Sequence, residues 1–461
     1  MIPTTLAQVA EVVEGSLVDI VDGAVEVVGV HSDTKNVGRG SLFVALEGTR
    51  VDGHDFASEA AAAGAVAVLG TRPTGEPTIV VPDVLIALGA LARFHIDRLT
   101  DTTVVAITGS VGKTTAKDLV AAVLEADGRT ISPPGSFNNE LGLPLTVLSA
   151  TLDTRYLVLE MGARGQGHID YLCSIAPPDI GVELMVGTAH LSEFGSRAAI
   201  ADAKAELVRA LPPTGTAVLN ADDDLVRGMR EQTAAEVAWF GSRAGSQVTA
   251  DDLAADDLDR ASFTLTTPQG SAPVALKLVG SHAVPNALAA AAVGWSVGID
   301  TTVIGEALSA ATPRSRWRME VTERADGLVV INDSYNASPE SMRAALKSLK
   351  NIAGKRRSWA VLGEMLELGD SSMSEHDSIG RLVVRLDVQR LVVVGEGARP
   401  MHLAAGLEGS WGQESVFVPD VQRALALLRD EVRADDVVLV KASRAAGLDL
   451  VAAELLESGT P

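Results

Sequence analysis

The chain has 461 residues, of which 47% are hydrophobic and 21% are charged, and these proportions are typical of a globular protein with about three domains. Its 38 Lys and Arg residues and 60 Asp and Glu residues give a formal net charge of −22, which argues against non-specific binding to nucleic acid or to anionic membranes. The single Cys173 excludes an intramolecular disulfide. Residues 1–14 lack a signal-peptide pattern and no apolar run is long enough to span a membrane, so we predict a cytoplasmic location without membrane insertion.

Residues 1–84 alternate short strands with one helix and are predicted to form a small α/β domain. Strands are expected at 26–30, 41–46, 65–69 and 78–81, and a helix at 56–64. Two polar clusters, at residues 31–35 and 52–55, are either binding loops or solvated loops, and local sequence favours neither. A helix over 84–99 then leads into the second domain.

The second predicted domain, residues 85–312, begins with a β-branched apolar run, a glycine-rich turn and a helix over 113–126. The turn is a shortened form of the G-x-x-x-x-G-K-[ST] phosphate loop, because Ile107 stands where the first glycine would fall. Backbone N–H groups at such a turn bind phosphate, Lys113 can reach the outer phosphates and Thr114 can ligate Mg²⁺. We therefore predict binding of a nucleoside triphosphate, with an ordinary strand-to-helix turn as the weaker alternative.

Three further residues of this domain are candidate metal or catalytic groups. Glu160 follows the strand 156–159, and the carboxyl ends of parallel strands line the ligand crevice. His190 lies at another strand-to-helix turn. Lys204 interrupts the apolar face of the helix 196–211, where it either snorkels to the rim or turns into the site with its charge altered. A capping glutamate and a structural histidine are the alternatives for Glu160 and His190.

The third predicted domain, residues 313–461, repeats the β/α alternation, with strands at 328–332, 358–362, 390–394, 415–418 and 437–441. Ser338 and Pro339 predict the start of a helix. Residues 333–336 therefore form a strand-to-helix loop at the ligand edge of the sheet. The run Gly395-Glu396-Gly397 is not a dinucleotide fingerprint, because Pro400 stands where its third glycine belongs. Before this domain, the acidic segment 250–261 is expected to be an insertion or a β-ribbon.

Collected together, these segments resemble the Mur ligase family from about Ser32 to Arg444. The phosphate loop is shared with folylpolyglutamate synthetases, whereas residues 138–144, 160–163, 189–196, 333–337 and 361–369 are more specific. They resemble the branch of the family that adds D-alanyl-D-alanine to UDP-N-acetylmuramoyl-tripeptide. The implied fold is α/β in three domains: a small UDP-sugar domain, a central, mostly parallel P-loop ATPase-like sheet, and a C-terminal Rossmann-like domain.

The resemblance implies an ATP-dependent acid–amino-acid ligase that forms a carbon–nitrogen bond and releases ADP and phosphate. ATP would convert a peptide carboxylate to an acyl phosphate, which the amine of D-alanyl-D-alanine attacks, in the synthesis of peptidoglycan precursors. Two Mg²⁺ ions and a carbamylated Lys204 are implied as cofactors, and the enzyme would be a monomer. Whether the third residue of the tripeptide is meso-diaminopimelate or lysine does not follow from the sequence.

The family's functional positions map onto this chain as four overlapping sets. The catalytic set is Lys113, Lys204, His190, Glu160, Arg316 and Asp333. The ATP-binding set is Gly109, Ser110, Val111, Gly112, Lys113, Thr114, Thr115, Asn138, Asn139, His282, Asn286, Arg316 and Asp333. The substrate-binding set is Ser32, Asp33, Thr34, Phe43, Ala45, Asp52, Gly53, His54, Tyr335, Asn336, Lys441 and Arg444. The metal set is Thr114, Glu160, His190 and the carbamate of Lys204.

The chain departs from the usual family pattern at five positions, of which Met185 matters most, since it replaces an asparagine near the implied metal site. The other four are Lys35, Ala283, Asn332 and Ala442. Among other classes, a GTPase is excluded because no guanine-reading Asn-Lys-x-Asp occurs. A folylpolyglutamate synthetase-like ligase would not explain the first domain, and a non-catalytic nucleotide-binding scaffold would not explain the retained metal set. Because the ATP residues come from two domains, we expect closure about hinges near 83–85 and 312–315.

Overall fold

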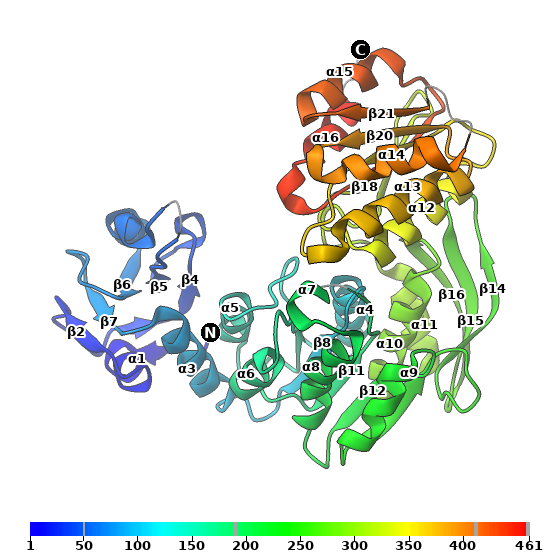
Figure 1. Ribbon diagram of the computed structural model, residues 1–461. Helices are drawn as coiled ribbons and strands as arrows, with labels where there is room; N and C mark the ends of the chain where they lie inside the picture. Colours follow the sequence, from blue (N-terminus) through cyan, green and yellow to red (C-terminus); the bar gives the residue numbers. More distant parts are fainter. Residues whose placement is uncertain (49–50, 189–190, 410–413, 458–461) are drawn as a thin grey trace.

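The computed structural model describes residues 1–48, 51–188, 191–409 and 414–457. The described residues form five sheets, and the three largest follow one another along the chain, the first on the left of Figure 1, the second below and the third at the upper right. The predicted α/β class with mostly parallel sheets is confirmed. Among the described residues, no helix is both long and apolar enough to cross a membrane.

The N-terminal sheet has five strands in the order β2-β7-β6-β5-β4, parallel except for β2. The predicted strand 26–30 is divided, because residues 26–27 pair with residues 4–5 in a separate two-stranded sheet, whereas residues 29–31 pair with residues 41–43 of the five-stranded sheet. The first helix was not predicted, although Thr5 and Gln8 form a capping box at its start. The elements are β1 (Thr4–Thr5), α1 (Leu6–Val12), β2 (Ser16–Val18), β3 (Glu26–Val27), β4 (Gly29–His31), η1 (Thr34–Asn36), β5 (Ser41–Val44), η2 (Gly53–Phe56), α2 (Ala57–Ala63), β6 (Ala65–Gly70), β7 (Thr78–Val80) and α3 (Val84–Ile96).

The central sheet has six parallel strands in the order β13-β12-β11-β8-β10-β9. Alternate residues of β8 face opposite layers: Val105 and Ile107 pack with α4 and α10, and Ala106 packs on the other side. The strands are β8 (Thr103–Thr108), β9 (Thr130–Ile131), β10 (Tyr156–Glu160), β11 (Ile180–Glu183), β12 (Thr216–Asn220) and β13 (Glu236–Phe240). The helices are α4 (Lys113–Glu125), α5 (Gly142–Ser149), α6 (His168–Ile175), α7 (Leu191–Phe194), α8 (Arg197–Arg209), α9 (Asp224–Gly228), η3 (Met229–Gln232), α10 (Ala283–Ser296) and α11 (Thr301–Ala310).

The acidic segment 250–261 belongs to a separate antiparallel sheet, β14 (Thr249–Ala255), β15 (Arg260–Thr267) and β16 (Gly270–Val279). This confirms the β-ribbon alternative. Asp251 and Asp252 are exposed on the edge strand β14, and α11 packs against β16.

The C-terminal sheet has six strands in the order β17-β18-β22-β19-β20-β21, and only β17 is antiparallel. Four of the five predicted strands have the predicted bounds, and the fifth is shifted by one residue. The strands are β17 (Glu320–Glu323), β18 (Val329–Asp333), β19 (Ser358–Leu362), β20 (Arg390–Val394), β21 (Ser415–Val418) and β22 (Val437–Lys441). The helices are α12 (Pro339–Ala353), η4 (Gly369–Ser371), α13 (Ser372–Arg385), η5 (Glu396–Ala398), α14 (Arg399–Glu408), α15 (Val421–Glu431), η6 (Arg444–Ala446) and α16 (Asp449–Glu457).

Helix α3 joins the first two sheets through a shared hydrophobic core. It packs against α1 on one side and against α5 and α6 on the other. One continuous cluster of buried side chains therefore runs from Leu6 and Val9, through Leu88 and Leu91, to Leu172. One face of the N-terminal sheet and one face of the central sheet therefore share a core, whereas their opposite faces pack in separate clusters.

Candidate active site

The phosphate loop joins the carboxyl end of β8 to the first turn of α4. Gly112 has a φ of +90°, and a Cβ there would lie 2.6 Å from the side-chain oxygen of Asn286, so only glycine fits. No side chain caps α4, which leaves its first N–H groups available to an anion. The Lys113 Nζ donates to Gly109 O at 2.8 Å, and burial lowers the pKa of Lys113.

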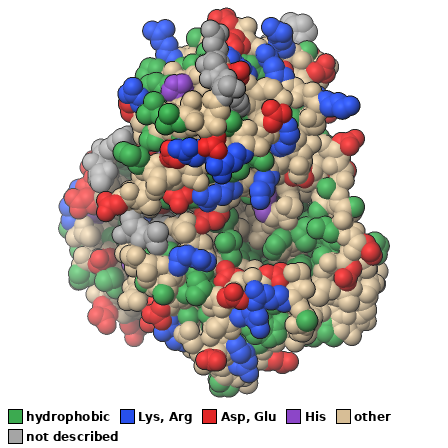
Figure 2. All heavy atoms as spheres, turned by 45° about the vertical axis from the view of Figure 1, so that its right-hand side comes forward, with side chains coloured by type: hydrophobic (Ala, Val, Ile, Leu, Met, Phe, Trp, Pro, Cys, Tyr) green, Lys and Arg blue, Asp and Glu red, His purple; other side chains and the backbone are tan. Residues whose placement is uncertain are grey.

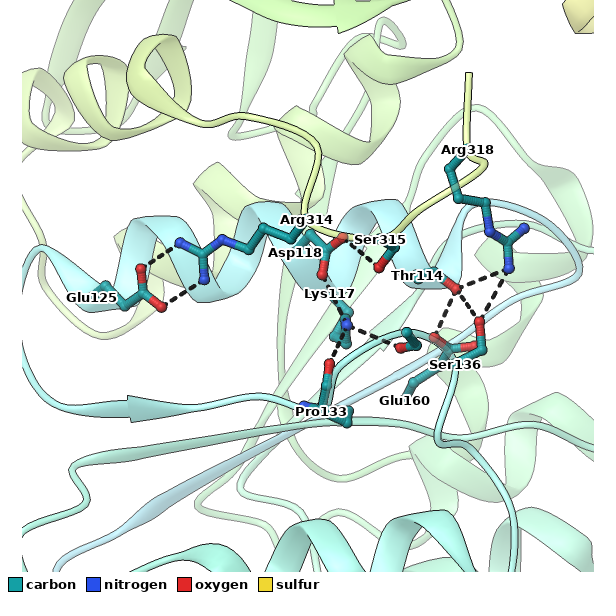
Figure 3. Close-up of polar contacts among 11 residues, drawn as sticks. Thr114, Lys117, Asp118, Glu125, Pro133, Ser136, Glu160, Arg314, Ser315 and Arg318 are labelled. Atoms are coloured by element: carbon teal, nitrogen blue, oxygen red, sulfur yellow. Dashed lines mark hydrogen bonds and ion pairs between the residues drawn. The ribbon is translucent and has the colours of Figure 1, made fainter. Parts of the chain in front are cut away.

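A hydroxyl and a carboxylate, both oxygen groups of the kind that Mg²⁺ prefers as ligands, meet beside this loop. The Thr114 Oγ1 donates to Glu160 Oε2 at 2.9 Å, and Asn138 Nδ2 donates to the other oxygen, Oε1, at 2.8 Å. Ser136 Oγ lies 2.8 Å from Thr114 Oγ1 (Figure 3). Mg²⁺ is usually held by one or two carboxylates together with substrate phosphates and water, and Thr114 and Glu160 fit that role. Among the described residues, no three His, Cys, Asp or Glu side chains cluster as a complete metal site.

A second buried group lies on the α8 side of the sheet. Lys204 is 6% exposed, and burial, reinforced by the nearby Lys113 charge, lowers its pKa to about 8. Glu183, at the end of β11, is fully buried, and neither of its carboxylate oxygens has a hydrogen-bond partner among the described residues. Burial raises the pKa of Glu183 to about 8, opposed by Lys204 and Lys113. The Lys204 amine and the Glu183 carboxyl are therefore both shifted toward their neutral forms.

The C-terminal sheet contributes a charged pair and an aromatic ring. Asp333 and Lys441 end the neighbouring strands β18 and β22, and Lys441 Nζ donates to Asp333 Oδ2 at 2.6 Å and to Asn336 O at 2.8 Å. Burial lowers the pKa of Lys441, and Asp333 opposes that shift. The Arg318 guanidinium lies 4.2 Å from the ring centre of Tyr335 and donates to Ser136 Oγ at 3.1 Å. Arg318 thus reaches the phosphate loop from the C-terminal side.

Except for Glu183, which is buried behind it, these groups line one cavity of about 600 Å³ between the central and C-terminal sheets. Figure 2 shows a hollow in this face of the molecule with basic side chains around it. The cavity lining has a small excess of positive side chains, although the whole chain is strongly acidic. The six cationic residues are Lys113, Arg164, Lys204, Arg318, Lys441 and Arg444, and the five acidic residues are Glu140, Glu160, Asp333, Glu340 and Glu367.

Comparison with known proteins identifies the family. Models of the Mur ligase family, catalytic domain, the Mur ligase middle domain and the Mur ligase, glutamate ligase domain match residues 26–95, 107–294 and 317–444. A Mycobacterium tuberculosis protein named UDP-N-acetylmuramoyl-tripeptide–D-alanyl-D-alanine ligase is 50% identical, and the match covers 100% of this chain and 99% of that protein. The chain belongs to the Mur ligase family.

Solved structures resemble this Mur ligase over nearly its whole length. MurF from Acinetobacter baumannii matches with a TM-score of 0.87 and 33% identity over 99% of each chain. MurF ligase from Thermotoga maritima, in complex with ADP, matches with a TM-score of 0.78 and 30% identity, covering 94% of this chain and 97% of that one. The three-domain Mur ligase fold expected from the sequence is confirmed.

Most of the site residues predicted for this Mur ligase line the same cavity. His190 lies outside the described residues. Arg316, which was predicted to complete the ATP site on closure, is exposed and is not among the described residues lining the cavity, whereas Arg318 lines it. The predicted residues in the cavity are Gly109, Ser110, Val111, Gly112, Lys113, Thr114, Thr115, Asn138, Asn139, Glu160, Lys204, His282, Asn286, Asp333, Tyr335, Asn336, Lys441 and Arg444.

The predicted sugar-binding residues of this Mur ligase lie in the N-terminal sheet, and none is among the described residues that line the cavity. The side chains of Phe43 and Ala45 are buried in a core with Val68, so a contact of these two residues with a ligand would come from their backbone. Asp52 accepts hydrogen bonds from His54 N, from Arg72 and, at 2.6 Å, from His54 Nδ1. These bonds hold the pKa of Asp52 below its usual range, and the bond from His54 N has the largest effect. Gly53 begins the 3₁₀ turn η2. Asp52, Gly53 and His54 thus form the start of this turn.

The cluster at residues 31–35 of this Mur ligase is more open. Asp33 caps η1 and is exposed, whereas Ser32 and Thr34 are half-buried, and Thr34 Oγ1 donates to Glu59 at 2.6 Å.

Sequence reasoning missed Arg318, Ser136, Glu183 and Glu340 of this Mur ligase. Glu340 Oε1 accepts from Thr188 N at 2.8 Å and from Thr188 Oγ1 at 2.6 Å, and so joins the C-terminal helix α12 to the central part. Arg318 lies two residues before the edge strand β17, and its position would have been a signal if that strand had been predicted. Glu183 gave a clear signal, since a lone acidic residue ends an apolar buried strand.

Proposed function

We propose that this chain is an ATP-dependent ligase that joins D-alanyl-D-alanine to UDP-N-acetylmuramoyl-tripeptide in the cytoplasm, as a monomer, during peptidoglycan precursor synthesis. This role would connect it to cell wall biogenesis, cell shape and cell division. The observation that carries the proposal is the single cavity in which the phosphate loop of the central part faces Asp333 and Lys441 of the C-terminal part. The names of the full-length relatives supply the two substrates.

In the proposed reaction, a carboxylate oxygen of the tripeptide attacks the γ-phosphorus of ATP, and the bond to ADP breaks. The amine of D-alanyl-D-alanine then attacks the carbonyl carbon of the acyl phosphate, phosphate leaves, and the amine releases a proton. Phosphoryl transfer depends mainly on positioning and charge neutralisation. The first turn of α4, Lys113 and Arg318 supply both, because their N–H groups converge on the phosphate loop.

The central and C-terminal parts would bind different groups of the ligands. Asn286 and His282 border the loop from α10 and would contact the nucleotide base, and Asp333 and Tyr335 approach from the other side. We assign Lys441 and Arg444 to the substrate carboxylates. Arg444 also lies 4.0 Å from the Trp317 ring centre and pairs with Asp449 at 2.7 Å, which fixes its direction.

Thr114 and Glu160 would hold one Mg²⁺, and His190 with Lys204 would hold a second. Bound Mg²⁺ would neutralise phosphate charge and orient the oxygens of the reacting groups. We propose that Lys204 carries a carbamate there. Its lowered pKa favours the neutral amine, the form that reacts with CO₂, and its burial disfavours a free ammonium. The largely neutral Glu183 would not repel the added negative charge at neutral pH.

The deciding experiment measures phosphate release from ATP with UDP-N-acetylmuramoyl-tripeptides that carry either meso-diaminopimelate or lysine. We expect release to require both a tripeptide and D-alanyl-D-alanine, and the preferred tripeptide identifies the third residue. Lys113→Ala is the matched inactive control, because it removes a phosphate-binding charge and leaves the cavity open. Release that depends instead on a folate and glutamate would overturn the proposal in favour of a folylpolyglutamate synthetase-like ligase.

A further inference from the structure

The chain between α11 and β17 runs along helix α4, which begins at the phosphate loop (Figure 3). We call residues 311–319 the linker. It contacts α4 at three levels: Arg314 pairs with Glu125 at the far end, Ser315 Oγ donates to Asp118 Oδ2 at 2.8 Å, and Arg318 reaches Thr114 at the near end. The Arg314–Glu125 pair is exposed, whereas Ser315 and Asp118 are each only 8% exposed.

Asp118 connects the linker to a lysine that no step of the proposed reaction uses. Its second oxygen, Oδ1, pairs with Lys117 Nζ at 2.8 Å. Lys117 is 1% exposed, and it also donates to the backbone oxygens of Pro133 at 2.5 Å and Gly135 at 3.0 Å. Three acceptors thus satisfy the three donors of the buried ammonium.

Pro133 and Gly135 belong to the segment 132–138, which we call the Pro-Gly loop. The other end of this loop reaches the site, because Ser136 contacts Thr114 and Asn138 donates to Glu160. Two sets of contacts therefore connect the linker to the Pro-Gly loop. In the direct route, Arg318 donates to Ser136. In the indirect route, Ser315 contacts Asp118, which pairs with Lys117, and Lys117 donates to the loop.

The indirect route is stiff for an electrostatic reason. A buried charge that loses a partner keeps its desolvation cost, so a group in a fully satisfied network resists displacement more than an exposed ion pair does. If the linker moved away from α4, Asp118 Oδ2 would lose its donor. The Lys117 charge and the two loop oxygens bound to it would then reorganise.

We propose that Lys117 and Asp118 are positioning residues that couple the linker to the Pro-Gly loop, so that docking of the linker on α4 and binding of nucleotide at the phosphate loop favour each other. This inference rests on the proposed nucleotide site. Because such coupling is reciprocal, nucleotide binding should stabilise the docked linker by the same free energy by which the docked linker stabilises nucleotide binding.

Hydrogen exchange of the full-length protein without nucleotide tests the contact route. Ser315→Ala removes one hydroxyl that does not touch the Pro-Gly loop, yet it should speed exchange of amides 132–138 by about threefold to tenfold. The matched control is Asn351→Ala, which removes another bond between the central and C-terminal parts, the 2.9 Å bond to Asp259 Oδ1. Unchanged exchange in Ser315→Ala, or an equal increase in Asn351→Ala, would overturn the coupling.

Calorimetric titration with ADP and Mg²⁺ tests the energetic link. Ser315→Ala should weaken ADP binding by about threefold to tenfold in the wild-type background and by less than about twofold in Lys117→Met, where the route is already broken. An equal weakening in both backgrounds would overturn the inference. If Lys117→Met does not fold, Lys117→Gln takes its place in the cycle. If the wild-type protein does not bind ADP, the proposed function fails, and the exchange measurement still decides the coupling.

Discussion

Two arginines two residues apart show why side-chain direction matters at the site. Arg318 follows Trp317 and precedes Met319, whose φ values are +60° and +49°. A left-handed conformation is uncommon for such bulky residues and costs free energy. The backbone turns at these two positions direct Arg318 into the cavity, and Arg316 remains exposed. Sequence spacing alone could not distinguish them.

We therefore expect opposite results from two alanine variants. Arg318→Ala should lower kcat by about 100-fold or more, because the guanidinium neutralises charge beside the phosphate loop. Arg316→Ala, a matched loss of one arginine from the same segment, should keep activity within about twofold of wild type. Steady-state phosphate release measures both, and a larger loss in Arg316→Ala would contradict the placement.

Lys204 allows a test of the proposed carbamate. Lys204→Ala should lose activity by about 100-fold or more, Lys204→Glu should regain only a little, and short carboxylates should restore part of the rate of Lys204→Ala. Protein equilibrated with ¹³C-bicarbonate should show a carbamate carbon signal that is absent from Lys204→Ala. A snorkelling lysine predicts instead that Lys204→Met stays active, without rescue by added acid and without the signal.

At the scale of elements, helix α3 contains a buried histidine. His95 is 0% exposed, its Nε2 lies 3.0 Å from Ala150 O, and its Nδ1 has no hydrogen-bond partner in the part of the chain that the structure describes. Burial lowers its pKa to about 4, against an ordinary value of about 6.5. Between pH 6.5 and 4, the His95 imidazole is therefore protonated in the unfolded chain but neutral in the folded protein. The free energy of unfolding falls as the pH is lowered through this range.

From this shift we expect the free energy of unfolding to fall by about 2 kcal/mol between pH 7.5 and pH 5 because of His95 alone. His95→Gln keeps a donor toward Ala150 O but cannot titrate, so its pH dependence should be weaker by that amount. Urea unfolding at the two pH values measures the difference. Parallel pH profiles for the two proteins would exclude His95 as the cause.

The elements also show what could be predicted from the sequence. The buried parallel strands of the C-terminal sheet are continuous apolar runs, so their bounds were predicted almost to the residue. The edge strand β17, with its mostly exposed Glu-Val-Thr-Glu sequence, lacks that signal. The phosphate loop and Glu160 were identifiable because glycines and strand ends carry local constraints. The orphaned carboxylate of Glu183 and the connection of Lys117 to Pro133 depend on tertiary contacts that no local pattern specifies.

At the scale of the whole molecule, few polar contacts join the C-terminal part to the rest. Besides the linker, they include Thr188 with Glu340 and Asn351 with Asp259. A turn of the chain at the predicted hinge, residues 312–315, would have to rearrange the contacts of Arg314 and Ser315 with α4, so we expect those contacts to change when the cavity closes. The other predicted hinge, near 83–85, lies where α3 enters a continuous core, so we expect less movement there.

Small-angle X-ray scattering should detect this closure. The radius of gyration should fall when an ATP analogue, Mg²⁺ and UDP-N-acetylmuramoyl-tripeptide are added together, because the site residues come from both sides of one cavity. Adding the tripeptide alone to Lys113→Ala serves as the control. Identical scattering curves with and without the ligands would argue against closure.

The core shared across α3 limits how this protein can be recombined. The predicted domain boundary at residue 84 suggests a chimaera in which residues 1–84 are exchanged between ligases of different sugar specificity. A cut at that point would separate Leu6 and Val9 from Leu88 and Leu91, and the apolar faces left on both fragments would favour aggregation. A chimaera that folds should keep α3 together with α1 on one side and with α5 and α6 on the other. The exchanged segment should therefore include the central part and end after it.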